Sequence, residues 1–293
     1  MVSDFTLLKK KLLLIASTGK FAQFPMKQVQ KYHHELEIFL NMYGDSLDGI
    51  ELLNLYEMQF YILLIVGKDI EAKVVLDRIL NQFGSNSKSQ RIKVLQSVYH
   101  EAIGERVVAS SILEKNADDM KLTRRLTTFD RSNVETYITS LGFYLNINPS
   151  DLLAWAELAH VYSEAGEYEK SVFCYKEVLL HEPCAYPMFY RAGLNYYYNF
   201  LREEKLLKGE RKEKLLELVH ILRNSRDHHL RCIEICDVYT KSWVGLNLIL
   251  NLKFNDKLNK YNTVKEIKTY LDENDKLRPL VEKRVNELVP NSN

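Results

Sequence analysis

The sequence predicts an all-α superhelical solenoid, and three observations favour this fold class. No proline occurs between Met26 and Asn148, and so long a proline-free stretch suits helices because proline breaks them. Apolar residues recur at spacings of three and four, whereas the strict alternation of a strand is scarce. One segment also carries the residue types of a helical repeat at fixed offsets, which predicts a stack of helical pairs.

The clearest repeat runs from Leu152 to Ala185. Counted from Leu152, large residues stand at positions 4, 7, 11 and 24, small ones at 8, 15 and 20, and proline at 32: Trp155, Leu158, Tyr162, Tyr175, Ala159, Gly166, Ser171 and Pro183. Small residues at positions 8 and 20 let helices A and B approach closely, and the large residues fill the space between them. This is the pattern of a tetratricopeptide repeat (TPR).

Weaker units begin at Leu53, Gln90, Tyr186 and Thr240, and a degenerate pair spans roughly 118–148. The Leu53 unit departs from the pattern at position 8, where Phe60 replaces a small residue. Amphipathic helices are expected near 4–18 and 26–43, and one or two more after residue 252, as caps for the open ends of the solenoid. We therefore predict one TPR solenoid over 1–293, with caps in 1–52, repeats in 53–185, an enlarged repeat in 186–239, and a last repeat with a cap in 240–293.

The Tyr186 unit contains an insertion of about 20 residues, because its position 20 falls at Ser225 and not at residue 205 (225 minus 205). The insertion, roughly 201–218, is rich in charges of both signs. One interpretation is a pair of helices that extend past the repeat body with solvated faces. The alternative is a projecting hairpin that contacts a partner.

Composition argues against several classes of partner and location. With 40 basic and 39 acidic residues the net charge is +1, so neither nucleic acid nor an anionic membrane is an expected partner. The four cysteines are too few for a disulfide framework and favour a reducing compartment. The apolar run from Leu12 to Ala16 is too short for a signal peptide. No continuous run approaches ~18 apolar residues, so no membrane span is expected.

No catalytic motif is recognisable in the sequence. The best metal candidate is His228, Cys232 and Cys236 on one helical face, with His220 two turns earlier. A single straight helix cannot wrap four ligands around zinc, and Cys232 occupies core position 27. We therefore expect no enzyme activity, no metal, no cofactor and no small-molecule substrate.

Solenoids bind partners along a concave face, and the TPR pattern implies that positions 2, 5, 9, 12 and 13 of the A helices line it. The expected partner-binding residues are Tyr61, Leu64, Ile65, His160, Tyr190, Leu194, Tyr197 and Tyr198. A tyrosine-rich lining suits a protein segment, since tyrosine gives a large contact area at low entropic cost. Alternatively, neighbouring or cap helices cover this lining. Trp155 and Trp243, both at position 4, are expected in the core.

Co-chaperones of this repeat class hold a carboxylate with Lys or Arg at position 5 and Asn at position 9. The Leu152 unit has Ala156 and His160 at these positions, and the Leu53 unit has Glu57 and Tyr61. A receptor for a C-terminal carboxylate is therefore disfavoured.

Two segments carry a family resemblance beyond the generic repeat. Ala154–Tyr162 and Tyr168–Leu180, with Phe173-Cys174-Tyr175 at its centre, resemble subunit 2 of the endoplasmic reticulum membrane protein complex. The similarity is strongest over Pro149–Tyr198, and the insertion and Lys241-Ser242-Trp243 resemble fungal members.

This resemblance implies a non-catalytic scaffold on the cytoplasmic face of the endoplasmic reticulum membrane. Such a subunit would be peripheral to the membrane and would hold cytosolic parts of the other subunits of a membrane protein insertase. The alternative is a stand-alone TPR adaptor that binds a linear peptide motif in its concave face.

Overall fold

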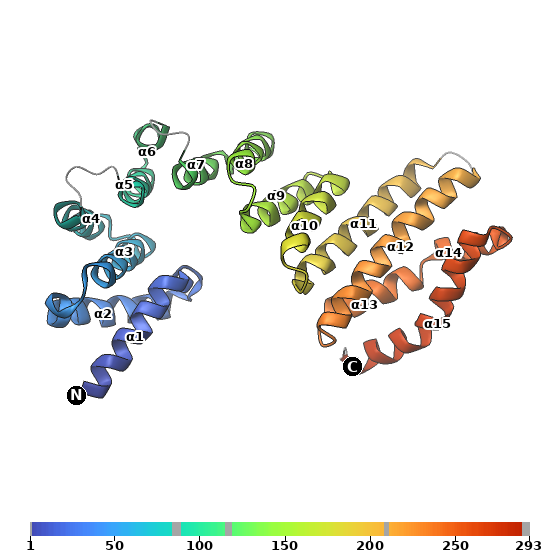
Figure 1. The fold of residues 1–293 in the computed structure, drawn as a ribbon, viewed down its shortest axis with the longest axis horizontal. Helices are drawn as coiled ribbons and strands as arrows, with labels where there is room; N and C mark the ends of the chain where they lie inside the picture. The colour runs from blue at the N-terminus through green and yellow to red at the C-terminus, as the bar shows by residue number, and fades with distance from the viewer. Residues whose placement is uncertain (1, 84–88, 115–118, 208–210, 289–293) are drawn as a thin grey trace. The chain divides into compact units, whose positions relative to one another are not determined.

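The computed structural model describes residues 2–83, 89–114, 119–207 and 211–288. Its regular elements in these ranges are all α-helices or short 3₁₀ helices (Figure 1), so the predicted all-α class is confirmed. The chain forms two compact units, Met1–Ser132 and Asn133–Asn293. The finer division into caps and repeats stays a prediction.

The described residues of the first unit form seven α-helices and three 3₁₀ helices. They are α1 (Val2–Thr18), η1 (Lys20–Gln23), α2 (Met26–Tyr43), η2 (Gly44–Ser46), α3 (Gly49–Val66), α4 (Asp69–Phe83), α5 (Gln90–Ala102), α6 (Arg106–Glu114), α7 (Met120–Thr127) and η3 (Thr128–Asp130). Residues 115–118, where the degenerate pair was expected to begin, lie outside the described ranges.

Helix α3 is the central helix of the first unit. It begins at a capping box, in which the Asp48 side chain accepts from the Glu51 amide and the Glu51 side chain accepts from the Asp48 amide. It ends at Gly67, whose φ of 78° is a conformation that glycine adopts without strain. Between these ends, Leu55 and Phe60 are fully buried. Phe60 thus fills position 8 with an aromatic ring where the regular repeat has a small residue.

Within the described residues, α3 is the one helix long and apolar enough to cross a membrane, judged by length and composition alone. Glu51, Asn54 and Glu57 interrupt its apolar run, which is why the sequence pattern did not single it out. Its buried residues pack within the core of the first unit, together with Leu12 of α1 and Leu36 of α2. The expectation that the chain has no membrane span stays a prediction.

The second unit contains the longest adjacent helices of the described chain, α11 (Tyr186–Leu206) and α12 (Lys212–Ile235). Its elements are α8 (Val134–Ile147), α9 (Leu152–Glu164), α10 (Tyr168–His181), α11 (Tyr186–Leu206), α12 (Lys212–Ile235), α13 (Thr240–Leu250), α14 (Lys253–Leu258), η4 (Asn259–Tyr261) and α15 (Lys265–Leu288). The N-cap Asp151 accepts from the Ala154 amide at the start of α9. Gly166, with φ of 77°, turns the chain into α10.

The pairs α9–α10 and α11–α12 are joined by the same polar contact. The Ser171 hydroxyl donates to the Ala159 carbonyl at 2.7 Å, and the Ser225 hydroxyl donates to the Gly193 carbonyl at 2.6 Å. Both contacts connect position 20 to position 8, where small residues allow close approach. The assignment of Ser225 to position 20, across about 20 extra residues, therefore agrees with the structure.

The extra length of α11 and α12 packs against the C-terminal helices of the same unit. Phe200 and Phe254 meet edge to face with ring centroids 5.1 Å apart. Leu215, Leu218 and Tyr270 join the same buried cluster. In its described residues the insertion extends α11 and α12, and part of its surface packs against α14 and α15. Lys208 and Glu210, at its centre, lie outside the described residues.

Both tryptophans are half-buried beside a backbone carbonyl six residues earlier. The Trp155 indole donates to Pro149 at 2.8 Å, and the Trp243 indole donates to Asp237 at 2.6 Å. Each ring also packs against a buried apolar cluster. They therefore lie at the rim of the core and are less buried than the core position expected for them.

Candidate functional site

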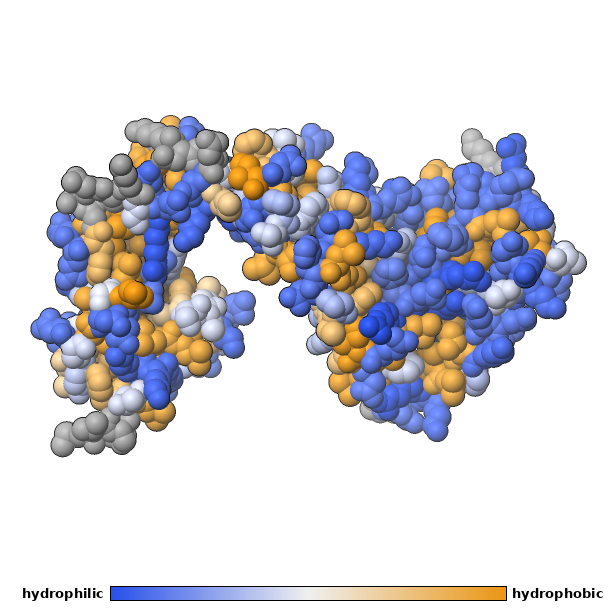
Figure 2. Space-filling model, viewed as in Figure 1, coloured by the Kyte–Doolittle hydropathy of each residue, from blue (hydrophilic) through white to orange (hydrophobic). Residues whose placement is uncertain are grey.

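The expected partner-binding residues fall on both units. Tyr61, Leu64 and Ile65 lie on α3 of the first unit, and the other five lie on α9 and α11 of the second. Figure 2 shows hydrophobic patches between hydrophilic stretches on the viewed face of each unit. The candidate site therefore consists of two surfaces, one on each unit.

A half-open cavity of about 490 Å³ lies beside Tyr61 in the first unit. We call it the α3 pocket. It is lined by Ala16, Ser17, Thr18, Gly19, Phe21, Asn54, Glu57, Met58, Tyr61 and Arg91. Its walls come from the end of α1, from η1, from the A-type helix α3 and from the start of α5.

An arginine joins two walls of the α3 pocket. Arg91 of α5 forms an ion pair with Glu57 and donates to the Asn54 side-chain oxygen at 2.7 Å. Asn54, Glu57 and Tyr61 stand at positions 2, 5 and 9 of the Leu53 unit, as the repeat pattern requires for an A-helix lining. Arg91 was not among the expected residues, although it occupies position 2 of the next unit, where the same rule could have found it.

Tyr61 lines the α3 pocket and keeps its proton. Its ring stacks with Phe21 at a centroid distance of 6.1 Å. Burial, followed by the nearby Glu57 carboxylate, raises the pKa of Tyr61 to about 12, against the opposing effect of Arg125 and Arg91. A phenol held neutral can both donate and accept a hydrogen bond. Leu64 is half-buried, and Ile65 is exposed at the end of α3.

The second surface is a row of tyrosines on α11. Tyr198 is exposed and lies between Tyr197 and Tyr168, with ring centroids 6.0 and 5.7 Å away. Tyr190 contacts the ring of Tyr239 at 5.4 Å and the imidazole of His229 at 5.8 Å. Burial raises the pKa of Tyr190 and of Tyr197, with Tyr198 as the next contribution in both. The Tyr190 and Tyr197 side chains are half-buried, so helices of the unit cover part of the expected lining.

The remaining expected residues differ in exposure. His160 of α9 is exposed, and its Nε2 lies 3.5 Å from Oε1 of Glu164, one turn later. Leu194 of α11 is half-buried. Two apolar residues of α13, Val244 and Leu248, are each 44% exposed at positions 5 and 9 of their own unit. They continue the apolar lining on the A helix that follows α11, and the repeat pattern would have identified them if it had been applied to α13.

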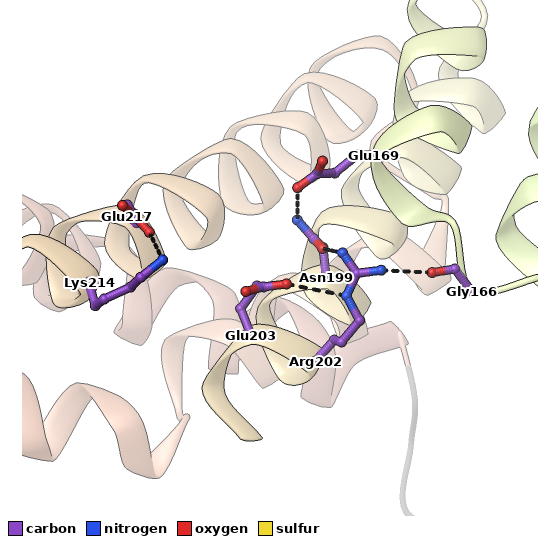
Figure 3. Close-up of polar contacts among 7 residues, drawn as sticks. All are labelled: Gly166, Glu169, Asn199, Arg202, Glu203, Lys214 and Glu217. Carbon is purple, nitrogen blue, oxygen red and sulfur yellow. Dashed lines mark hydrogen bonds and ion pairs between the residues drawn. The ribbon is translucent and has the colours of Figure 1, made fainter. Parts of the chain in front are cut away.

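A polar network fixes α11 against the preceding pair (Figure 3). The Arg202 guanidinium donates to the Gly166 carbonyl at 3.0 Å and to the Asn199 side-chain oxygen at 2.8 Å. The Asn199 amide in turn donates to Glu169 at 3.3 Å. Because Gly166 and Glu169 belong to the α9–α10 turn and to α10, this network sets the position of the tyrosine row relative to α9.

The histidine and cysteine cluster on α12 has structural contacts. Cys232 is fully buried, as position 27 predicts. His228 packs against the rings of Phe189 and Tyr196, and burial lowers its pKa. Over the described parts of the chain, no group of three His, Cys, Asp or Glu residues is arranged to hold a metal ion.

Comparison with known proteins bears on the family. Residues 68–197 match the family model of the EMC2 TPR-like repeat domain. The chain is 26% identical over 258 residues to "ER membrane protein complex subunit 2" of Saccharomyces cerevisiae. This match covers 83% of this chain and 84% of that protein. This chain is therefore similar to EMC2 proteins, with the family model matching its central part.

Further similarities concern another TPR protein and the fold. "TPR repeat protein oca3" of Schizosaccharomyces pombe is 28% identical over 203 residues, or 67% of this chain and 66% of that protein. The C-terminal part of a TPR repeat-containing protein of Cytophaga hutchinsonii superposes with a TM-score of 0.54 at 12% identity, over 97% of this chain and 96% of the other. The latter similarity concerns the fold alone and confirms the TPR solenoid.

Proposed function

We propose that this chain is a member of the EMC2 family and acts as a non-catalytic scaffold subunit of a membrane protein insertase complex of the endoplasmic reticulum. It holds cytosolic segments of other subunits and lies at the cytoplasmic face of the membrane as a peripheral component. The observation that carries the proposal is the EMC2 match across most of the chain, since relatives with that match are named as subunits of this complex.

The two surfaces on the A helices support a binding role. The α11 row offers neutral phenols and aromatic faces, which are rigid contact groups typical of protein interfaces. Val244 and Leu248 extend this surface with partly exposed apolar side chains. A polar neighbour such as Arg202 holds the surface in place through backbone and side-chain contacts, so the surface is preformed for a partner.

Affinity purification of the tagged chain from detergent extracts, followed by mass spectrometry, tests the proposal. We expect stable recovery of several membrane subunits. The variant Tyr198→Glu should reduce that recovery, because a charge would enter an aromatic contact surface. Leu180→Glu is the matched control, since Leu180 is 74% exposed on the B-type helix α10.

Recovery of the chain only as a free protein would contradict the scaffold proposal. If one soluble protein with a shared short motif were recovered in place of membrane subunits, the chain would be the stand-alone adaptor that the sequence also allows. Equal loss with Tyr198→Glu and Leu180→Glu would contradict the assignment of the interface to the A helices.

A further inference from the structure

We propose that the α3 pocket binds a basic side chain, the ammonium of lysine or the guanidinium of arginine, from a protein segment lying along the first unit. This inference rests on the proposed scaffold function and adds the chemistry of one subsite to it. Three features of the pocket carry it: its size, its supply of acceptor oxygens and its aromatic wall.

The pocket has the volume of a side-chain subsite. At about 490 Å³ it falls within the range of small ligand sites, roughly 300–1,000 Å³. It is open on one side, so a long side chain can enter while its backbone stays outside. Ser17 and Thr18 line it from the end of α1, and the one cation among its described lining residues, Arg91, is paired with Glu57.

The pocket is rich in hydrogen-bond acceptors. It lies at the end of α1, where the carbonyls of Ser17 and Thr18 are among the four that lack an amide partner within the helix. The Ser17 and Thr18 hydroxyls already donate to the Leu14 carbonyl, at 3.0 and 2.8 Å, which leaves their oxygens as acceptors. The negative end of the α1 dipole also points to this region.

Glu57 adds a carboxylate with remaining capacity. Arg91 engages one of its two oxygens, Oε2, and in the described part of the chain the other has no hydrogen-bond donor. A carboxylate accepts several hydrogen bonds at once, so a second cation can share Glu57 with Arg91.

The two arginines near the pocket are already paired. Arg91 is engaged by Glu57 and Asn54, and Arg125, which also influences Tyr61, is paired with Glu101. An anionic ligand would have to compete with these carboxylates. A cationic ligand can instead bind the acceptor oxygens that have no donor among the described residues. We therefore infer that the ligand of this pocket is positively charged.

The third feature is the aromatic wall. Tyr61 and Phe21, which both line the pocket, stack on each other, and Met58 is a further apolar lining residue. A cation over such rings gains a cation–π interaction, and the methylene stem of lysine or arginine packs against the apolar surface. A neutral side chain of the same length would gain only the latter contact.

Methyl NMR of the full chain with ¹³C-methyl methionine provides the test. The probes are N-acetyl-lysine amide and N-acetyl-arginine amide, with N-acetyl-norleucine amide as the neutral control and N-acetyl-glutamate amide as the anionic one. We expect a saturable shift of the Met58 signal with at least one cation in the millimolar range. The affinity for N-acetyl-norleucine amide should be at least about threefold weaker than that for the better cation. Met188, in the second unit, serves as the internal reference.

Two variants locate the binding. Glu57→Gln should weaken the cation about threefold, and Glu71→Gln on the exposed side of α4 should leave it unchanged. Tyr61→Leu leaves the Glu57–Arg91 pair in place and should also weaken the affinity for the cation. If Glu57→Gln unfolds the unit, this second variant tests whether the cation binds in the α3 pocket. Binding of glutamate or norleucine as tightly as the cations, or no Met58 shift, would overturn the inference.

The relative affinities of the two cations identify which basic group the pocket prefers. Because the titration uses the isolated chain, it can fail while membrane subunits still co-purify, and it can succeed when they do not. The subsite and the scaffold function are therefore tested separately.

Discussion

The pairs α9–α10 and α11–α12 are neighbouring repeats of the second unit that differ in length but share the contact joining their helices. In both, a serine hydroxyl at position 20 donates to the carbonyl at position 8. They differ at position 24, where α10 has Tyr175 and α12 has His229. A repeat can therefore gain about 20 residues without disturbing the contact between its helices. The added residues lengthen the end of α11 and the start of α12, away from the serine contact.

The difference at position 24 has consequences for the neighbouring helices. His229 lies between α11 and α13, close to Gly193 on one side and Gly245 on the other. A Cβ built on Gly245 would approach the imidazole Cε1 to 2.7 Å, and one on Gly193 would approach Cδ2 to 3.1 Å. The ring therefore occupies the space that side chains at these two positions would need.

Removing the contact that supports the longer pair should have the largest effect. Phe200→Ala deletes a fully buried ring that meets Phe254, and we expect a loss of about 3–5 kcal/mol in the unfolding free energy of the second unit. Urea unfolding followed by tryptophan fluorescence measures it, because both tryptophans lie in this unit. Leu206→Ala, at a residue 65% exposed in the same extension, is the control and should change stability by less than about 0.5 kcal/mol. Equal effects would contradict a structural role for the extension.

The residue at position 24 should give the α11–α12 pair an acid-dependent stability, because this position holds His229 in α12 and Tyr175 in α10. Burial, with a smaller contribution from His228, lowers the pKa of His229 to about 4. The unfolded state therefore binds a proton between about pH 6.5 and pH 4 that the folded state does not. Stability is fully present above the unfolded pKa and falls as pH drops through this window, by roughly 3 kcal/mol in all.

The comparison of the native chain with His229→Leu isolates this contribution. The variant should lose that part of the pH dependence while keeping the part due to His228, whose pKa is lowered in the same direction. Denaturant midpoints at pH 7 and pH 4.5 measure the difference. The same acid dependence in both proteins would show that His229 does not remain neutral in the fold.

Adding a methyl group at position 8 of the longer pair should have an intermediate effect. Gly193→Ala places a Cβ 3.1 Å from His229 and 3.2 Å from the Ser225 carbonyl. We expect a net destabilisation of about 1–2 kcal/mol, because the clash outweighs the ~1 kcal/mol helix propensity of alanine over glycine. Gly142→Ala on α8, with open space around its Cβ, is the control and should be neutral or stabilising. In a double-mutant cycle, His229→Ala should relieve the penalty.

The shared serine contact should give the smallest effect and the closest match between the pairs. Ser171→Ala and Ser225→Ala each remove one buried hydroxyl hydrogen bond, and each should lower the unfolding free energy by about 1 kcal/mol. The same fluorescence assay applies to both. A large loss in one pair and none in the other would refute the equivalence of the two contacts.

The repeat pattern predicted most of what depends on local spacing. Ser225 could be assigned across the insertion because position 20 needs a small residue opposite position 8, and α2 begins at Met26 and ends at Tyr43 as expected. What the pattern missed depends on packing between elements distant in sequence. Gly245 faces His229 of the preceding pair, and Arg91 pairs with Glu57 across 34 residues. The position rule can place Arg91 on the lining, but neither contact follows from periodicity, since each depends on how successive pairs stack.

The position of His229 between two glycines has an evolutionary consequence. The three residues can change only in a restricted order, because enlarging either glycine first brings a new side chain against the ring. A lineage that replaces the histidine with a small residue would release both glycines to drift toward alanine. We therefore expect that, among relatives that keep histidine at this position, the two glycines vary little and are retained together.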